Sequence, residues 1–294
     1  MLRAQSGFTL MEMVVSLVVL GLMSVVMLPL LTMPANSYMD AQRRVELHQQ
    51  MALIRSKLSD DVKLAMPGSL RQTCVGANCF LEYLEVRATA RYRKAAGGAA
   101  FCAAACGGNV LTPACANENC ATTLGPAHLV VAGVNPVVNV DYVAVPGSGN
   151  GNLPLPYTLA PAGTLTRLTN WTPRANDVGL RFQNKTFAPA PAGWTSDRLY
   201  LISQPVTYAC NTTTGRLTKF WGYAIAPTGV QPTAFGANVN NAVLSDLVTR
   251  CLPPSVVTQG LRQTVTWRIT LARNVAGQPV ESVESLIQLG VREP

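Results

Sequence analysis

The residues of this chain best suited to covalent chemistry are its eight cysteines. All of them follow an apolar N-terminal run, at Cys74, Cys79, Cys102, Cys106, Cys115, Cys120, Cys210 and Cys251. An even number of cysteines in this arrangement favours disulfides formed in an oxidising compartment such as the periplasm. Zinc sites usually place two residues between paired cysteines, whereas the close pairs here are separated by four, three and four residues. We therefore predict disulfides and no metal site.

The cysteine spacing favours local pairing. The expected bonds are Cys74–Cys79, Cys102–Cys106 and Cys115–Cys120, which leaves Cys210–Cys251 to close a loop of roughly 40 residues. Eight cysteines allow 105 complete pairings, and the second and third local groups could also cross-pair with each other. The long pair would join the end of one predicted strand to a turn that precedes the final strands.

A short basic segment could bind an anion. Arg87, Arg91, Arg93 and Lys94 lie close together, with two tyrosines nearby, and such a group could contact DNA or another polyanion. Arginine and lysine also protect exposed strand edges from unwanted pairing. Because the segment is short, we favour a solvated strand edge and keep nucleic acid as a less favoured partner.

No catalytic constellation is evident in the sequence. Serine, aspartate and histidine do not cluster in a nucleophile motif, and there is no phosphate-binding loop. The two histidines, His48 and His128, are far apart, and the net charge of +8 is spread along the chain. We expect a protein that is not an enzyme and needs no cofactor.

One charged residue stands in an otherwise uncharged apolar run. From Phe8 to Leu31 only Glu12 carries a charge, and about 20 apolar residues suffice to cross a bilayer. A carboxylate in such a segment is costly and usually marks a functional site with a specific partner. A conventional signal peptide ends in a small residue after its apolar core. Here the small residue, Gly7, precedes the core, so cleavage after it would leave the apolar segment on the mature chain.

The hexapeptide Gly7-Phe8-Thr9-Leu10-Met11-Glu12 with the following apolar run resembles the class III signal of type IV prepilins and pseudopilins. This resemblance implies that a prepilin peptidase cuts after Gly7 and methylates the new N-terminus at Phe8. It also implies that Glu12, at the fifth mature position, pairs with the N-terminal amine of an adjacent subunit during assembly. Gly7 and Phe8 are thus the expected processing residues, and Glu12 is the expected assembly residue.

Two downstream segments resemble MshO-type minor pilins of the mannose-sensitive haemagglutinin (MSHA) pilus. One comprises residues 204–210, 215–217, 220–223 and Cys251, and the other residues 36–41 with the helix that follows. These pilins are related to J-type pseudopilins of type II secretion. The resemblance implies a minor subunit that initiates or caps a type IV pilus used in surface attachment. The alternatives are a J-type pseudopilin at the pseudopilus tip, and a tip adhesin or DNA-uptake subunit.

The same resemblance implies where the chain resides and what it contacts. We expect a single-pass precursor in the bacterial inner membrane with a periplasmic C-terminal domain, which later reaches the pilus tip at the cell surface. Expected partners are other major and minor pilins through the N-terminal helix, the prepilin peptidase and the inner-membrane assembly platform.

We expect Phe8 and Glu12 to lie at the start of a long N-terminal helix. Apolar residues recur at spacings of three and four, which predicts a helix face packed on a domain. They are Leu47, Met51, Ile54, Leu58, Val62 and Ala65. We predict a helix from Phe8 to about Met66, interrupted at Pro29 and Pro34, and ended by Pro67-Gly68.

After residue 70 the pattern changes to short β segments. We expect strands at 80–93, 198–208, 217–225, 264–272 and 280–291, with the second and third joined as a hairpin through Thr214-Gly215. Tyr83 is expected on a polar face of the first strand, and residues 95–123 in a disulfide-pinned loop. The 23 glycines and 20 prolines agree with a loop-rich β domain.

These elements predict an α+β protein with the type IV pilin fold, in which a long N-terminal helix packs on an antiparallel β-sheet domain. The expected organisation is a leader at 1–7, a transmembrane half-helix at 8–31, an amphipathic half-helix at 32–67 and a β-rich globular domain at 68–294.

Overall fold

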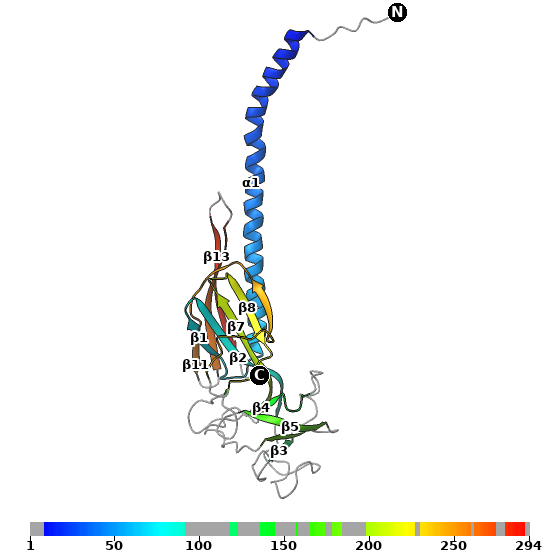
Figure 1. Cartoon of the computed structure of the whole chain (residues 1–294), viewed down its shortest axis with the longest axis vertical. Helices are drawn as coiled ribbons and strands as arrows, with labels where there is room; N and C mark the ends of the chain where they lie inside the picture. Colours follow the sequence, from blue (N-terminus) through cyan, green and yellow to red (C-terminus); the bar gives the residue numbers. More distant parts are fainter. Residues whose placement is uncertain are drawn as a thin grey trace, which may run out of the picture.

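A computed structural model describes residues 9–91, 118–122, 136–144, 157, 165–173, 178–183, 198–226, 230–259, 262–274 and 280–291. The described chain is α+β: one long N-terminal helix is followed by antiparallel strands (Figure 1). The fold class therefore agrees with the sequence-based expectation. The residues 92–117 that follow β2, which include most of the predicted cysteine-rich loop, lie outside the described residues.

The helix α1 spans Leu10–Lys63. It continues through Pro29 and Pro34, so the expected interruption at these residues is wrong. A proline removes one backbone donor and favours a bend over a break, and the ribbon of α1 bends in its N-terminal half (Figure 1). In the part of the chain that the structure describes, no helical segment is both long and apolar enough to qualify as a membrane span.

The helix ends three residues before the predicted Met66 because the chain begins to pair with a strand. The amide of Met66 donates to the Leu84 carbonyl at 2.8 Å, and the Val86 amide donates to the Leu64 carbonyl at 2.8 Å. The Met66 amide and the Leu64 carbonyl thus find partners in β2 instead of the partners that another helical turn would provide. The end of α1 is thereby fixed to the middle of β2.

The larger sheet contains nine strands within the described residues. In spatial order β1, β2, β7, β4, β5, β6 and β3 form one path, while β8 pairs with β7 and β9 pairs with β8. Their bounds are β1 Arg71–Val75, β2 Asn78–Arg91, β3 Glu118–Thr122, β4 Tyr142–Ala144, β5 Leu165–Pro173, β6 Val178–Gln183, β7 Arg198–Asn211, β8 Arg216–Trp221 and β9 Asn240–Ser245. The strand β3 lies within the segment predicted as a loop, which corrects that expectation for residues 118–122.

A second, smaller sheet is formed by the C-terminal strands. The central strand β12 pairs with β13 along its length and with β10 and β11 on its other edge. The bounds are β10 Val248–Cys251, β11 Ser255–Gln259, β12 Arg262–Arg273 and β13 Glu281–Val291. The predicted strands at 264–272 and 280–291 are therefore confirmed as β12 and β13.

The predicted hairpin between β7 and β8 is confirmed. Asn211 pairs with Arg216 at its closed end, and Val206 pairs with Trp221 at the open end. Gly215 has a φ of 69°, a left-handed conformation that glycine adopts without a steric penalty. This explains why the Thr214-Gly215 dipeptide was a reliable turn signal.

The main core lies between α1 and both sheets. All six apolar residues predicted for the buried face of α1 are buried, from Leu47 to Ala65. They belong to one cluster with residues of the larger sheet, such as Tyr83 and Tyr208, and of the smaller sheet, such as Trp267. The assignment of Tyr83 to a polar face is wrong, because α1 covers that face of β2.

Two further clusters extend the core beyond the end of α1. One contains Phe182 and Leu201 with seven other buried apolar residues, and the other is built around Met66, Tyr157 and Tyr200. They lie where β4, β5, β6 and β3 continue the large sheet past the helix (Figure 1). The long strands β2 and β7 run through both parts and connect them.

Candidate functional site

The first turn of α1 presents Glu12 to solvent. Thr9 caps the helix: its Oγ1 accepts a hydrogen bond from the Glu12 amide at 3.3 Å. This arrangement uses a free amide of the first turn, and the helix dipole favours a negative side chain there. Glu12 is exposed, so its carboxylate is accessible to another chain. The processing residues Gly7 and Phe8 lie outside the described residues.

The N-terminal half of α1 exposes a long apolar surface. The large apolar side chains described between Leu10 and Met27 are 45–84% exposed. The hydroxyls of Ser16 and Ser24 donate to helix carbonyls at 2.7 and 2.8 Å. Because these donors are satisfied within the helix, the two serines add little polarity to the surface. A monomeric soluble protein rarely exposes a contiguous apolar area of this kind. The surface is therefore suited to an apolar environment or to other apolar helices.

The C-terminal half of α1 is anchored at its polar flanks as well as through the core. Arg44 contacts Glu281 of β13 at 2.9 Å, and Arg273 of β12 contacts Glu46. These two ion pairs hold the end of the β12–β13 hairpin beside the helix. Near the other end of α1, Asp61 accepts hydrogen bonds from Tyr208 and Lys219 of the larger sheet.

A buried ion pair stabilises the edge of the large sheet. Arg71 of β1 donates two hydrogen bonds to Glu82 of β2, at 3.1 and 2.9 Å, and its guanidinium lies 3.5 Å from the centre of the Tyr157 ring. Burial raises the pKa of the Glu82 carboxyl, although the hydrogen bonds and the charge of Arg71 act in the opposite direction. The Tyr157 hydroxyl donates to the Ser69 carbonyl at 2.7 Å. Sequence reasoning missed this cluster.

One residue of the basic segment Arg87–Lys94 is paired with a buried carboxylate. Arg87 lies 3.3 Å from Asp141, whose side chain is buried and whose Oδ2 also accepts the Val137 amide at 2.8 Å. Burial raises the pKa of Asp141, while the Val137 hydrogen bond and Arg87 oppose that rise. Arg91 is exposed at the end of β2. Arg93 and Lys94 lie outside the described residues, so the structure does not bring the four cations together as one site.

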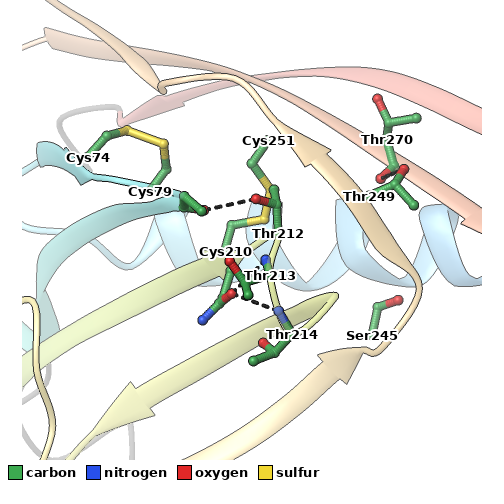
Figure 2. The surroundings of a disulfide bond; sticks show 12 residues. Cys74, Cys79, Cys210, Thr212, Thr213, Thr214, Ser245, Thr249, Cys251 and Thr270 are labelled. Atoms are coloured by element: carbon green, nitrogen blue, oxygen red, sulfur yellow. Dashed lines mark hydrogen bonds between the residues drawn. A yellow bond between two sulfur atoms is a disulfide. The ribbon is translucent and has the colours of Figure 1, made fainter.

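Two of the predicted disulfides are present. Cys74–Cys79 joins β1 to β2, and Cys210–Cys251 joins β7 of the larger sheet to β10 of the smaller sheet (Figure 2). The first closes a hairpin, whereas the second connects the two sheets across 41 residues of sequence. Cys102, Cys106 and Cys115 fall outside the described residues, and only the backbone of Cys120 is described, in β3.

A cleft of about 480 Å³ lies between α1 and the β7–β8–β9 part of the sheet. Its lining combines apolar side chains, including Leu53, Trp221 and Val243, with Asp61 and Lys219. The two carboxylates at the cleft, Asp61 and Glu85, have partners in Lys219 and Ser203. Within the described ranges, no group of three or more histidine, cysteine or acidic side chains could hold a metal ion.

Comparison with known proteins identifies the N-terminal segment. The family described as the prokaryotic N-terminal methylation motif matches residues 2–28. Neither the comparison with curated proteins nor that with solved structures gave a match. The matched segment contains Gly7, Phe8 and Glu12 and most of the exposed apolar surface of α1. This motif indicates a type IV pilin-like or pseudopilin protein, made as a precursor that prepilin peptidase processes and that assembles with other pilins.

Proposed function

We propose that this chain is a minor pilin that initiates or caps an MSHA-like type IV pilus used in surface attachment. The observation that carries the proposal is the division of α1 into two halves. Its first half combines the methylation motif with an exposed apolar surface and Glu12, while its second half is built into the core of a large β domain. A filament subunit needs both an apolar assembly helix and a folded globular domain. We call that domain, the β sheets with the second half of α1, the head.

The proposed precursor is held in the inner membrane by residues 8–31, with the β domain in the periplasm. The 22 residues of α1 from Leu10 to Leu31 span about 33 Å, enough to cross a hydrocarbon core of about 30 Å. Cleavage after Gly7 and methylation of Phe8 would produce the mature N-terminus. The two disulfides support folding of the head in an oxidising compartment.

Assembly is proposed to depend on Glu12. An amine and a carboxylate attract strongly where water is excluded, so the Glu12 carboxylate and the N-terminal amine of a neighbouring subunit would align the two helices. The exposed position of Glu12 in the first turn supports this role, since no described side chain of the same chain covers it. The force for assembly would come from the platform proteins.

A tip position is supported by the shape of the head. The large sheet continues past the end of α1 as a second lobe formed by β3 to β6 (Figure 1). Such a lobe would crowd a tightly wound shaft but has room at a filament end. The pairing of Arg87 with buried Asp141 favours a structural role for that part of the basic segment over DNA uptake.

The second candidate function is that of a J-type pseudopilin at the tip of a type II secretion pseudopilus, which the same motif supports. Disruption of the gene, with the full chain restored from a plasmid, separates the two. Loss of surface pili with normal secretion of folded periplasmic proteins supports the pilus role. Loss of secretion with normal pili supports the pseudopilin role, and an effect on neither contradicts both.

A further inference from the structure

The two described disulfides are neighbours in the sheet. Cys79 of β2 pairs in register with Cys74 of β1 on one side and with Cys210 of β7 on the other. Directly opposed residues of antiparallel strands point to the same face, with Cα atoms about 4.5–5.5 Å apart, which lies within the Cα spacing of disulfides. Cys79 and Cys210 therefore satisfy the approximate spacing of a disulfide, although each is bonded to a different cysteine (Figure 2).

The four cysteines, taken in the order Cys74, Cys79, Cys210 and Cys251, form a row that differs in solvent exposure along its length. Cys74 and Cys251 are half-buried, whereas Cys79 is 5% exposed and Cys210 is fully buried. A reductant can therefore approach the row from its ends, at Cys74 in the β1–β2 hairpin or at Cys251 in β10. Cys79 and Cys210 are both buried, and Cys210 belongs to the main core that α1 covers.

We propose that these four cysteines form a thiol–disulfide relay, in which reduction of Cys74–Cys79 at the sheet edge releases the Cys210–Cys251 bond between the sheets. A dithiol, such as the active site of a thiol–disulfide oxidoreductase, supplies two electrons and two protons and becomes a disulfide. Cys74 and Cys79 become thiols.

The second step needs no further oxidant or reductant. The Cys79 thiolate attacks the Sγ of Cys210, a Cys79–Cys210 bond forms, and the Cys210–Cys251 bond breaks. The electron pair leaves on the Sγ of Cys251, which takes up the proton that Cys79 lost. Exchange of this type depends on access of the thiolate to the disulfide and on stabilisation of the leaving thiolate. Cys251 is half-buried, so its departing thiolate can be solvated and protonated, whereas a thiolate at Cys79 is buried. The exchange therefore moves the negative charge to the better solvated sulfur atom.

The exchange changes which parts of the molecule are joined. Before the exchange, Cys210–Cys251 connects β7 of the larger sheet to β10 of the smaller sheet. After exchange, the new bond connects β2 to β7, which the sheet already holds together. The disulfide cross-link between the sheets is lost, while the main chain between β9 and β10 and the core around α1 remain. A reductant acting at the β1–β2 hairpin thus loosens the C-terminal sheet at a distance.

The test uses the full-length chain in detergent, with peptide mapping by mass spectrometry after the free thiols are alkylated at acidic pH. In C74S the freed Cys79 is expected to displace Cys251, so that a Cys79–Cys210 peptide replaces most of the Cys210–Cys251 peptide and Cys251 becomes alkylated. The matched control, C79S, frees Cys74, which is one strand further from Cys210. It is expected to retain Cys210–Cys251 with Cys74 alkylated.

Wild-type protein provides an independent test that does not depend on the folding of a variant. Limited treatment with dithiothreitol should give a singly reduced species alkylated at Cys74 and Cys251. Alkylation at Cys74 and Cys79, or at Cys210 and Cys251, would overturn the relay. So would a C74S protein that retains Cys210–Cys251, or a C79S protein in which Cys74 is found bonded to Cys210.

Discussion

Leu53 and Ile54 are consecutive residues of α1 that lie in opposite environments: Leu53 is 53% exposed beside the cleft, whereas Ile54 is fully buried in the main core. This contrast defines how the second half of the helix is attached to the head. It also supplies a matched pair of substitutions for measuring that attachment.

Replacement of Ile54 by alanine should lower the free energy of unfolding of the head by about 2–5 kcal/mol, because it leaves a cavity between α1 and both sheets. The same change at Leu53 should cost less than about 1 kcal/mol, since its side chain already contacts water. Urea denaturation followed by tryptophan fluorescence measures both, and Trp267 in the same core reports the transition. Equal effects of the two substitutions would contradict the assigned packing.

The two disulfides should contribute unequally to stability. Serine replacement of both Cys210 and Cys251 removes a link across 41 residues, while replacement of Cys74 and Cys79 removes one across five. Loop entropy predicts losses of about 4 and about 2 kcal/mol in the free energy of unfolding. Denaturation of the two double variants under the same oxidising conditions gives the comparison. The reverse order would show that the link between the sheets is not the main covalent constraint.

The buried carboxyl of Glu82 should make stability depend on pH. Since its pKa is raised in the folded state, the folded protein binds a proton that the unfolded chain releases. The stabilisation that comes from binding this proton is fully present below pH 4.5, the ordinary pKa of a glutamate. It is lost as the pH rises through the higher pKa of Glu82 in the folded state. The free energy of unfolding of the wild type relative to Glu82→Gln should therefore fall from about pH 4 towards neutrality.

A control for this pH effect is Glu284→Gln, which alters an exposed ion pair with Arg268. Wild type and this variant should show similar pH profiles, because solvent screens the exposed pair. If Glu82→Gln and the wild type also run parallel between pH 4 and 7, the assignment of a raised pKa to Glu82 is wrong.

Substitution of Glu12 by alanine should leave cleavage intact but reduce incorporation into filaments by at least about tenfold, because a neighbouring subunit's amine would lose its partner in a dry environment. Ser16→Ala, one helical turn further along, should assemble normally, since the Ser16 hydroxyl bonds only to its own helix. Sheared filaments and membranes are compared by immunoblotting. Normal incorporation of Glu12→Ala would contradict the assembly role.

The buried face of α1 was predictable from sequence because helix periodicity is local. The positions of Ile54 and its apolar neighbours specify one side of the helix whatever strands cover it. The β7–β8 hairpin and the Cys74–Cys79 bond were predictable for the same reason, since each depends on a few adjacent residues. The Cys210–Cys251 pair followed once the other cysteines were assigned locally.

The position of Tyr83 was not predictable from its strand alone. Alternation indicated a polar face, but Cys79 to Leu84 of β2 are all buried, with Tyr83 in the main core beneath α1 and Leu84 in another core cluster. The Arg71–Glu82 pair was missed because β1 is only five residues long and carries no clear apolar alternation. The packing of Tyr83 depends on how α1 lies on the sheet, which neighbouring residues in the sequence do not encode.

The candidate functional residues of the N-terminus were predicted from a motif and not from the fold. Gly7, Phe8 and Glu12 were recognised by their residue types and spacing, and the methylation motif matches the same segment. The chemistry proposed for them involves a peptidase and a second subunit, so the fold of one chain determines only part of it. The structure contributes the exposed first turn and the apolar helix surface behind it.

The most direct test of the account is the identity of the mature N-terminus. The chain is isolated from cells with and without prepilin peptidase, and its first peptide is sequenced by mass spectrometry. We predict an N-methylated Phe8 in the presence of the peptidase, an intact Gly7–Phe8 bond in its absence, and no processing of a Gly7→Leu variant, whose side chain would obstruct the scissile bond. A mature chain that begins after the apolar run, or that keeps its first seven residues in cells with the peptidase, would contradict the account.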